Sequence, residues 1–178
     1  QHIEQYKKLK TPFYHYNLEI LEQTLDLLTA ESNRYGYHVH YALKANVNDA
    51  VLSTIKKYQL GADCVSGNEV KKALETGFGN ENIVFAGVGK TDDEINFALE
   101  NDIFCFNCES LPEMEVINEL AEKKNKVANI ALRINPNINA KTHHYITTGL
   151  EENKFGINMW EMAEVIPAIK KLGNLKLI

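Results

Sequence analysis

Apolar residues at helical spacing alternate with short apolar runs along the whole chain. Leu18, Leu21, Leu25 and Leu28 recur every three or four positions, which predicts a helix over residues 18–32. The same reading predicts helices near 49–58, from 67 onward and over 159–171, and strands at 39–43, 61–65, 83–86, 103–106, 127–134 and 175–178. Strands that alternate with helices predict a parallel sheet with helices packed outside it.

Three of the predicted βα junctions carry the same start signal for a helix. In each, a hydroxyl residue is followed three positions later by a glutamate: Ser66 and Glu69, Thr91 and Glu94, Ser110 and Glu113. We expect each hydroxyl to accept a hydrogen bond from an N-terminal backbone amide, and each glutamate to reach back to the N–H of the cap residue. Three such capping boxes between strand and helix strengthen the prediction of a βα repeat.

The ends of the predicted strands decide between the two architectures that βα repeats allow, a doubly wound sheet and a (β/α)8 TIM barrel. Lys44, Asp63 and Arg133 each fall at or near the C-terminal end of a different strand. Barrel enzymes assemble their sites at that face, from several strands. We therefore predict a barrel, and because a complete one normally needs about 250 residues, the chain would hold only its N-terminal portion.

Lys44 is the strongest candidate for chemistry, since it lies within the run at residues 41–46 (YALKAN), at the end of the first strand. Side-chain alternation would place His40, Ala42 and Lys44 on the lumen face, with Tyr41 and Leu43 turned toward the helices. Ala42 would then leave room beside the lysine for a flat ring. A lysine mounted on a rigid element at the rim of a barrel suits a Schiff-base role, whereas a lone lysine would more often be a solvated rim residue.

Composition excludes several classes of partner. A content of 44% hydrophobic and 24% charged residues, with a net charge of -5, is typical of a soluble globular protein. Without a lysine or arginine cluster, neither nucleic acid nor an anionic membrane surface is expected as a partner. No apolar run approaches the roughly 20 residues of a membrane span, and residues 1–10 lack the apolar core of a signal peptide, so we expect a cytoplasmic protein.

Neither the cysteines nor the histidines predict a metal site. Three cysteines do not make a disulfide framework, which suits a reducing compartment. Cys105 and Cys108 have redox or zinc spacing, but there is no second pair, and on an extended strand their side chains point to opposite faces. His143 and His144 are adjacent, so their side chains diverge unless the loop bends sharply. We expect no metal at either place.

Motifs in a fixed order carry a resemblance over nearly the whole chain. They are residues 11–14 (TPFY), 41–46 (YALKAN), 61–67 (GADCVSG), 84–90 (VFAGVGK), 107–110 (NCES), 132–136 (LRINP), 142–143 (TH), 145–149 (YITTG) and 153–156 (NKFG). The sequence resembles the diaminopimelate decarboxylase family, pyridoxal-phosphate enzymes with an alanine-racemase-like barrel of fold type III. The lysine motif is shared with ornithine and arginine decarboxylases, whereas the later motifs single out the diaminopimelate branch.

The resemblance implies roles for individual residues. Lys44 would bind pyridoxal 5'-phosphate covalently and return a proton or release product, and Asp63 would lie close to the lysine and the ring. Arg133 would border the cofactor, and Ala42 would also contact it. The partner would be a small-molecule amino-acid substrate. The long connection between 135 and 155 is rich in donors, and its candidates for contact with the substrate are His143, Thr148 and Lys154.

The resemblance also implies a domain organisation and an activity. Residues 1–17 would form an N-terminal extended segment that belongs to a C-terminal β-domain, and residues 18–178 would be a partial barrel of an enzyme that is a homodimer at full length. The implied reaction converts meso-2,6-diaminopimelate to L-lysine and CO2, the last step of lysine biosynthesis. Two alternatives stay open: decarboxylation of another basic amino acid or carboxynorspermidine, and a pyridoxal-phosphate-binding barrel without catalysis. Lys141 and Asn68 depart from the usual pattern of the family, which has histidine and glycine there.

Overall fold

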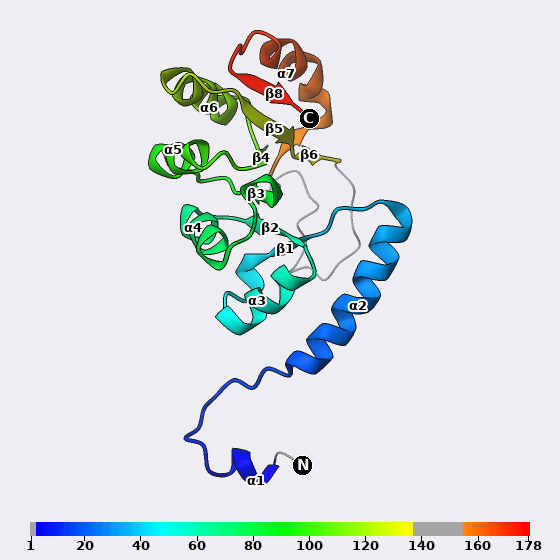
Figure 1. Cartoon of the computed structure of the whole chain (residues 1–178). Helices are drawn as coiled ribbons and strands as arrows, with labels where there is room; N and C mark the ends of the chain where they lie inside the picture. The colour runs from blue at the N-terminus through cyan, green and yellow to red at the C-terminus, as the bar shows by residue number, and fades with distance from the viewer. Residues whose placement is uncertain (1–2, 137–154) are drawn as a thin grey trace.

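The computed structural model describes residues 3–136 and 155–178 (Figure 1). Within them, six strands form one parallel sheet in the order β1-β2-β3-β4-β5-β8. Their bounds are β1 His40–Ala42, β2 Gly61–Cys64, β3 Ile83–Phe85, β4 Cys105–Cys108, β5 Ala128–Leu132 and β8 Leu175–Leu177. A separate two-stranded parallel pair joins β6 Ile134–Asn135 to β7 Ile157–Asn158. The predicted strands are all present, but β4 begins two residues later than expected. The strand expected over 127–134 is divided into β5 and β6, which lie in different sheets.

The order of the strands decides the architecture. From β1 to β5, each strand lies beside the strand that precedes it along the chain, and β8 follows β5 at the edge of the sheet. Strands are therefore always added on the same side. A doubly wound sheet would start in the middle and reverse at a switch point. Strands added in one direction curve into the wall of a barrel, as the fan of strands in Figure 1 shows.

From β1 onward, helices alternate with the strands and lie along one face of the sheet, whereas the first helix of the chain lies apart from the sheet (Figure 1). Their bounds are α1 Ile3–Tyr6, α2 Leu18–Tyr35, α3 Asp49–Lys57, α4 Gly67–Thr76, α5 Asp92–Glu100, α6 Leu111–Lys123 and α7 Met162–Ile169, with 3-10 turns at Leu43–Ala45, Asn80–Asn82 and Met159–Glu161. Residues 7–17 form neither helix nor strand, so the assignment of 1–17 to a β-domain stays a prediction. In the described part of the chain, no helix is long and apolar enough to cross a bilayer.

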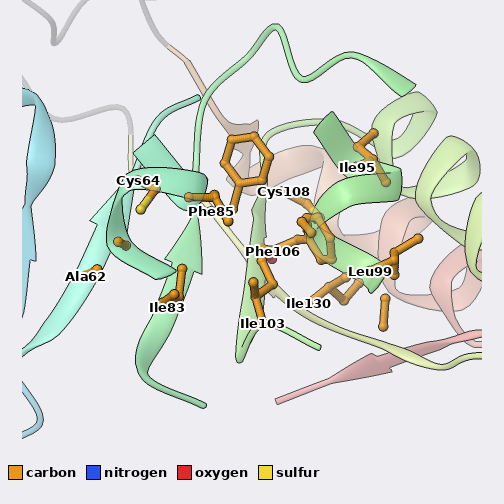
Figure 2. Packing of buried hydrophobic residues seen from close by; sticks show 14 of the residues in the cluster. Ala62, Cys64, Ile83, Phe85, Ile95, Leu99, Ile103, Phe106, Cys108 and Ile130 are labelled. Carbon is orange, nitrogen blue, oxygen red and sulfur yellow. Dashed lines mark hydrogen bonds between the residues drawn. The ribbon is translucent and has the colours of Figure 1, made fainter. Parts of the chain in front are cut away.

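The core lies between the sheet and the helices (Figure 2). Along β2, β3 and β4, alternate side chains are fully or almost fully buried on the helix side, among them Cys64, Phe85 and Phe106. The rings of Phe85 and Phe106 pack with their centroids 6.1 Å apart. Burial of one such ring contributes about 1.5–3 kcal/mol. The residues between them, such as Asp63 and Asn107, are only half-buried, so the opposite face carries the polar groups.

In two of the three predicted capping boxes, the glutamate accepts a hydrogen bond from a different backbone N–H than expected. Thr91 and Glu94 form the complete box, because Thr91 Oγ1 accepts from Glu94 N and Glu94 Oε2 accepts from Thr91 N. Ser66 Oγ also accepts from Glu69 N, at 3.3 Å. The Glu69 carboxylate, however, accepts from Val65 N, one residue further back, at 2.8 Å.

The third box departs from the prediction in the same way. Ser110 Oγ accepts from Glu113 N, but the Glu113 carboxylate accepts from Glu109 N at 2.7 Å. The physical reason lies in the backbone of the cap residue: φ is -157° at Ser110 and -155° at Ser66, against -84° at Thr91. This rotation turns the N–H of the serine away from the glutamate and presents the preceding N–H instead. The loop before each helix is thereby tied to the helix.

Candidate active site

A cavity of about 890 Å³ opens beside the C-terminal ends of strands β2 to β5. Its lining brings together Lys44, Asp63 and Arg133, which the sequence placed at the ends of three different strands. The volume is that of a site for a cofactor-sized or drug-sized ligand. Ala42 is not among the lining residues, although it pairs in register with Asp63. The position of Ala42 beside the flat ring of a cofactor stays a prediction.

Lys44 reaches the cavity from a turn and not from the strand. Strand β1 ends at Ala42, and Leu43–Ala45 forms a 3-10 turn in which Leu43 is fully buried and Lys44 is exposed. The alternation predicted along the strand therefore does not extend to Lys44. The Tyr41 hydroxyl closes this turn by donating to the Asn46 carbonyl at 3.3 Å.

The amino group of Lys44 is available for a ligand. Within the part of the chain that the structure describes, Nζ makes no hydrogen bond and no ion pair. Other lysines of the described chain, such as Lys72, Lys124 and Lys126, are held by carboxylates. An unengaged lysine at the rim of a cavity is the arrangement that a covalent attachment point needs.

Asp63 presents an unpaired oxygen close to the cavity. It lies on β2 between Ala62 and Cys64, both fully buried on the helix side, and its own side chain belongs to the opposite face. Its Oδ1 is buried and accepts no hydrogen bond from any described residue. Leaving a buried carboxylate oxygen without a donor costs free energy. Asp63 is thus suited to accept a hydrogen bond from a ligand that carries an N–H group.

Arg133 is held by a glutamate that the sequence analysis gave no role. Arg133 Nη1 donates to Glu109 Oε1 at 2.9 Å and to Oε2 at 3.1 Å. The Glu109 side chain is only 4% exposed, whereas that of Arg133 is 51% exposed. The guanidinium carbon also lies 5.6 Å from the centroid of the Phe155 ring. Glu109 therefore offsets the charge of Arg133 and fixes its position at the cavity.

Gly87 forms part of the cavity wall in a conformation that only glycine adopts readily. Its φ is +112°, and a Cβ there would lie 3.2 Å from the Val65 carbonyl oxygen. The loop after β3 is thus pressed against the loop after β2. Residues 84–90 were part of the sequence resemblance, but only the folded chain shows that this glycine lines the cavity.

Three candidates for contact with the substrate, His143, Thr148 and Lys154, lie outside the described residues, as does the departure at Lys141. Their roles stay predictions. Phe155, by contrast, is described and lines the cavity. A sequence pattern could have drawn attention to Glu109, which stands between strand β4 and the serine that caps α6.

The cysteines are buried and unpaired with one another. All three are free thiols, and burial raises the pKa of Cys105 to about 11 and that of Cys64 to about 12. Burial also raises the pKa of Cys108. Cys108 shares the helix side with Phe106, so alternation turns Cys105 to the other face. The described residues contain no group of three potential metal ligands.

Replacing Cys105 and Cys108 together by serine should leave activity per folded molecule unchanged in the full-length protein. Thiols with raised pKa values stay protonated near neutral pH and are poor nucleophiles. The buried hydroxyls should lower the free energy of unfolding by about 1–3 kcal/mol. Urea denaturation and turnover normalised to bound cofactor would measure both quantities. Lost turnover with unchanged stability and cofactor content would point to a redox or metal role.

Comparisons with known proteins agree on one family. Residues 20–178 match the model of the pyridoxal-dependent decarboxylases, pyridoxal binding domain. Diaminopimelate decarboxylase of Bacteroides thetaiotaomicron is 54% identical over 177 residues, which are 99% of this chain and 46% of that protein. The enzyme of Campylobacter jejuni is 46% identical over 159 residues, 86% of this chain and 39% of that protein.

Solved structures give the same result. The crystal structure of diaminopimelate decarboxylase from Helicobacter pylori complexed with L-lysine matches this chain with a TM-score of 0.89 and 40% sequence identity. The match covers 100% of this chain and 45% of the Helicobacter pylori chain. The enzyme from M. jannaschii, in co-complex with L-lysine, has a TM-score of 0.84 and 36% identity over 99% of this chain and 42% of that one. The chain thus spans less than half the length of these relatives. It belongs to the pyridoxal-dependent decarboxylase family and forms the N-terminal portion of the barrel that binds the cofactor.

Proposed function

We propose that the full-length protein decarboxylates meso-2,6-diaminopimelate to L-lysine and CO2, with pyridoxal phosphate as its cofactor. The observation that carries the proposal is the amino group of Lys44, which no described residue engages, at a cavity of about 890 Å³ in a domain that matches a pyridoxal-binding family. The choice of substrate rests on the relatives, which are named diaminopimelate decarboxylases at up to 54% identity.

The residues present fit the cofactor. Lys44 offers a primary amine for covalent attachment to an aldehyde, and Asp63 Oδ1, which has no partner among the described residues, offers an acceptor for an N–H group nearby. Gly87 lets the loop after β3 lie against the loop after β2, and residues of both loops line the cavity that would take up the ring. Arg133 supplies a cation at the same cavity for an anionic group of the cofactor or substrate. When bound, pyridoxal phosphate supplies the electron sink for the pair left behind by CO2.

The protein's own contribution is attachment, orientation and proton transfer. Nζ of Lys44 would hold the cofactor, give it up to the amino group of the substrate, and afterwards carry a proton to the carbon that has lost CO2. Asp63 would hold an N–H group by accepting a hydrogen bond, and Arg133 would orient a carboxylate through its remaining donors.

Further parts of the proposal concern groups outside the described residues. His143, Thr148 and Lys154 would border the distal amino-carboxylate centre of the substrate. We also propose a homodimer, by analogy with the family, and a cytoplasmic location, which the free thiols of the chain support.

Competition assays would test the choice of substrate. The complete protein should release CO2 from meso-diaminopimelate with a kcat/KM at least about 10³-fold above that for ornithine, arginine or lysine, because polar groups built to hold a distal carboxylate and ammonium are left unpaired by ligands without them. Comparable values for ornithine or arginine would move the protein to another decarboxylase branch. Cofactor binding without turnover of any of these amino acids would favour a non-catalytic barrel.

A further inference from the structure

Lys90 is a buried lysine immediately behind the wall of the cavity. It lies in the loop between β3 and α5, and its side chain is only 1% exposed. Its Nζ donates to the Gly87 carbonyl at 2.9 Å, to the Asn107 carbonyl at 3.0 Å and to Glu113 Oε1 at 2.5 Å. A buried ammonium is costly unless it is paired, and a lysine has three hydrogens to donate. Here all three are used.

The two carbonyls that Lys90 binds belong to residues that line the cavity, Gly87 and Asn107, whereas Lys90 itself does not line it. The Gly87 carbonyl belongs to the loop after β3, and that of Asn107 to the end of β4. On its other side Gly87 meets the Val65 carbonyl of the neighbouring loop. The backbone at Gly87 is therefore fixed by Val65 on one side and by Lys90 on the other.

The same network continues to the arginine of the cavity. Glu113 uses one carboxylate oxygen for Lys90 and the other for the Glu109 backbone N–H, at 2.7 Å. The Glu109 carboxylate in turn holds Arg133. Two cations and two carboxylates thus form a continuous chain of contacts through the walls contributed by β3, β4 and β5.

We propose that Lys90 is a positioning residue for the cofactor. It holds the Gly87 loop and the end of β4 in the geometry against which the cofactor is seated, and it supports Glu109, and through it Arg133, by way of Glu113. Lys90 does so without touching the cofactor. This inference rests on the proposed function, because it presumes that the cavity takes up pyridoxal phosphate.

Two variants of the full-length protein separate positioning from mere stability. Lys90→Met removes the ion-pair partner of the Glu113 carboxylate, whose side chain is only 14% exposed, and should lower both the melting temperature and the affinity for pyridoxal phosphate. Lys90→Met combined with Glu113→Gln removes the stranded charge, and the amide oxygen can still accept the Glu109 N–H. Because the ties to Gly87 and Asn107 stay broken, we expect most of the melting temperature to return while Kd stays at least about tenfold above that of the wild type.

The matched control is Lys124→Met, which breaks the 2.7 Å ion pair with Glu100; neither of these two residues lines the cavity. Its Kd, measured by absorbance titration with pyridoxal phosphate, should equal that of the wild type. The proposal is overturned if the double variant regains the Kd of the wild type along with its stability, or if it fails to fold. A wild-type protein that does not bind pyridoxal phosphate would overturn the proposed function instead, and this inference with it.

Discussion

Lys44→Ala in the full-length protein should lower kcat for decarboxylation by at least about 10³-fold, because attachment of the cofactor and proton transfer would be lost together. Stability should change by less than about 0.5 kcal/mol in the protein without cofactor, as is usual for an exposed side chain. The reason is that Nζ makes no hydrogen bond or ion pair with any described residue. Release of CO2 and urea denaturation would measure the two effects.

A matched control for this prediction is Lys71→Ala. Lys71 is a 62% exposed lysine on α4 that is absent from the cavity lining. Its loss should leave kcat unchanged. If Lys44→Ala kept more than a tenth of the activity of the wild type, another amine would have to carry the cofactor. Lys90 could not be that amine without breaking its three hydrogen bonds.

Arg133→Met should destabilise the full-length protein by about 2–3 kcal/mol, more than Glu109→Gln does. Removing one member of a buried ion pair costs about 3–5 kcal/mol when the charge left behind is buried. Arg133→Met strands Glu109, whose side chain is 4% exposed, whereas Glu109→Gln leaves an arginine that is 51% exposed and open to water. Because Arg133 is half-exposed, the expected loss lies below the range for a pair in which both partners are buried.

The double variant Arg133→Met with Glu109→Gln is the control, and urea denaturation gives the free energies of unfolding. It should recover most of the stability that Arg133→Met loses, because no charge is then stranded. It should still bind pyridoxal phosphate more weakly than the wild type, since the cation at the cavity is gone. Equal destabilisation by the two single variants would show that the burial of Glu109 does not govern the pair.

Much of the fold could be predicted because it depends on local patterns. Apolar runs marked the strands, and capping residues marked the starts of α4, α5 and α6. The convergence of Lys44, Asp63 and Arg133 on one cavity follows from topology, since the C-terminal ends of parallel strands meet at one edge of the sheet.

The details of the fold that were predicted wrongly depend on contacts between residues that are distant in the sequence. The apolar run at 103–106 marked a strand, but β4 runs from Cys105 to Cys108, because its ladder is set by pairing with β3 and β5. Side-chain alternation could not place Lys44, since the chain leaves β1 at Ala42 for a turn.

Pairs that are far apart in the sequence were also missed. Lys90 and Glu113 are separated by 23 positions, and Glu109 and Arg133 by 24. No periodicity in the sequence connects residues at such distances. These pairs become visible only when neighbouring strands of the barrel wall place their loops side by side.

Covalent attachment of the cofactor to Lys44 is the central claim, and one measurement tests it directly. Borohydride reduction of the full-length protein, followed by peptide mass mapping, should place the pyridoxyl group on the peptide that contains Lys44 and on no other lysine. A pyridoxyl group on Lys90, Lys141 or Lys154, with Lys44 unmodified, would contradict it.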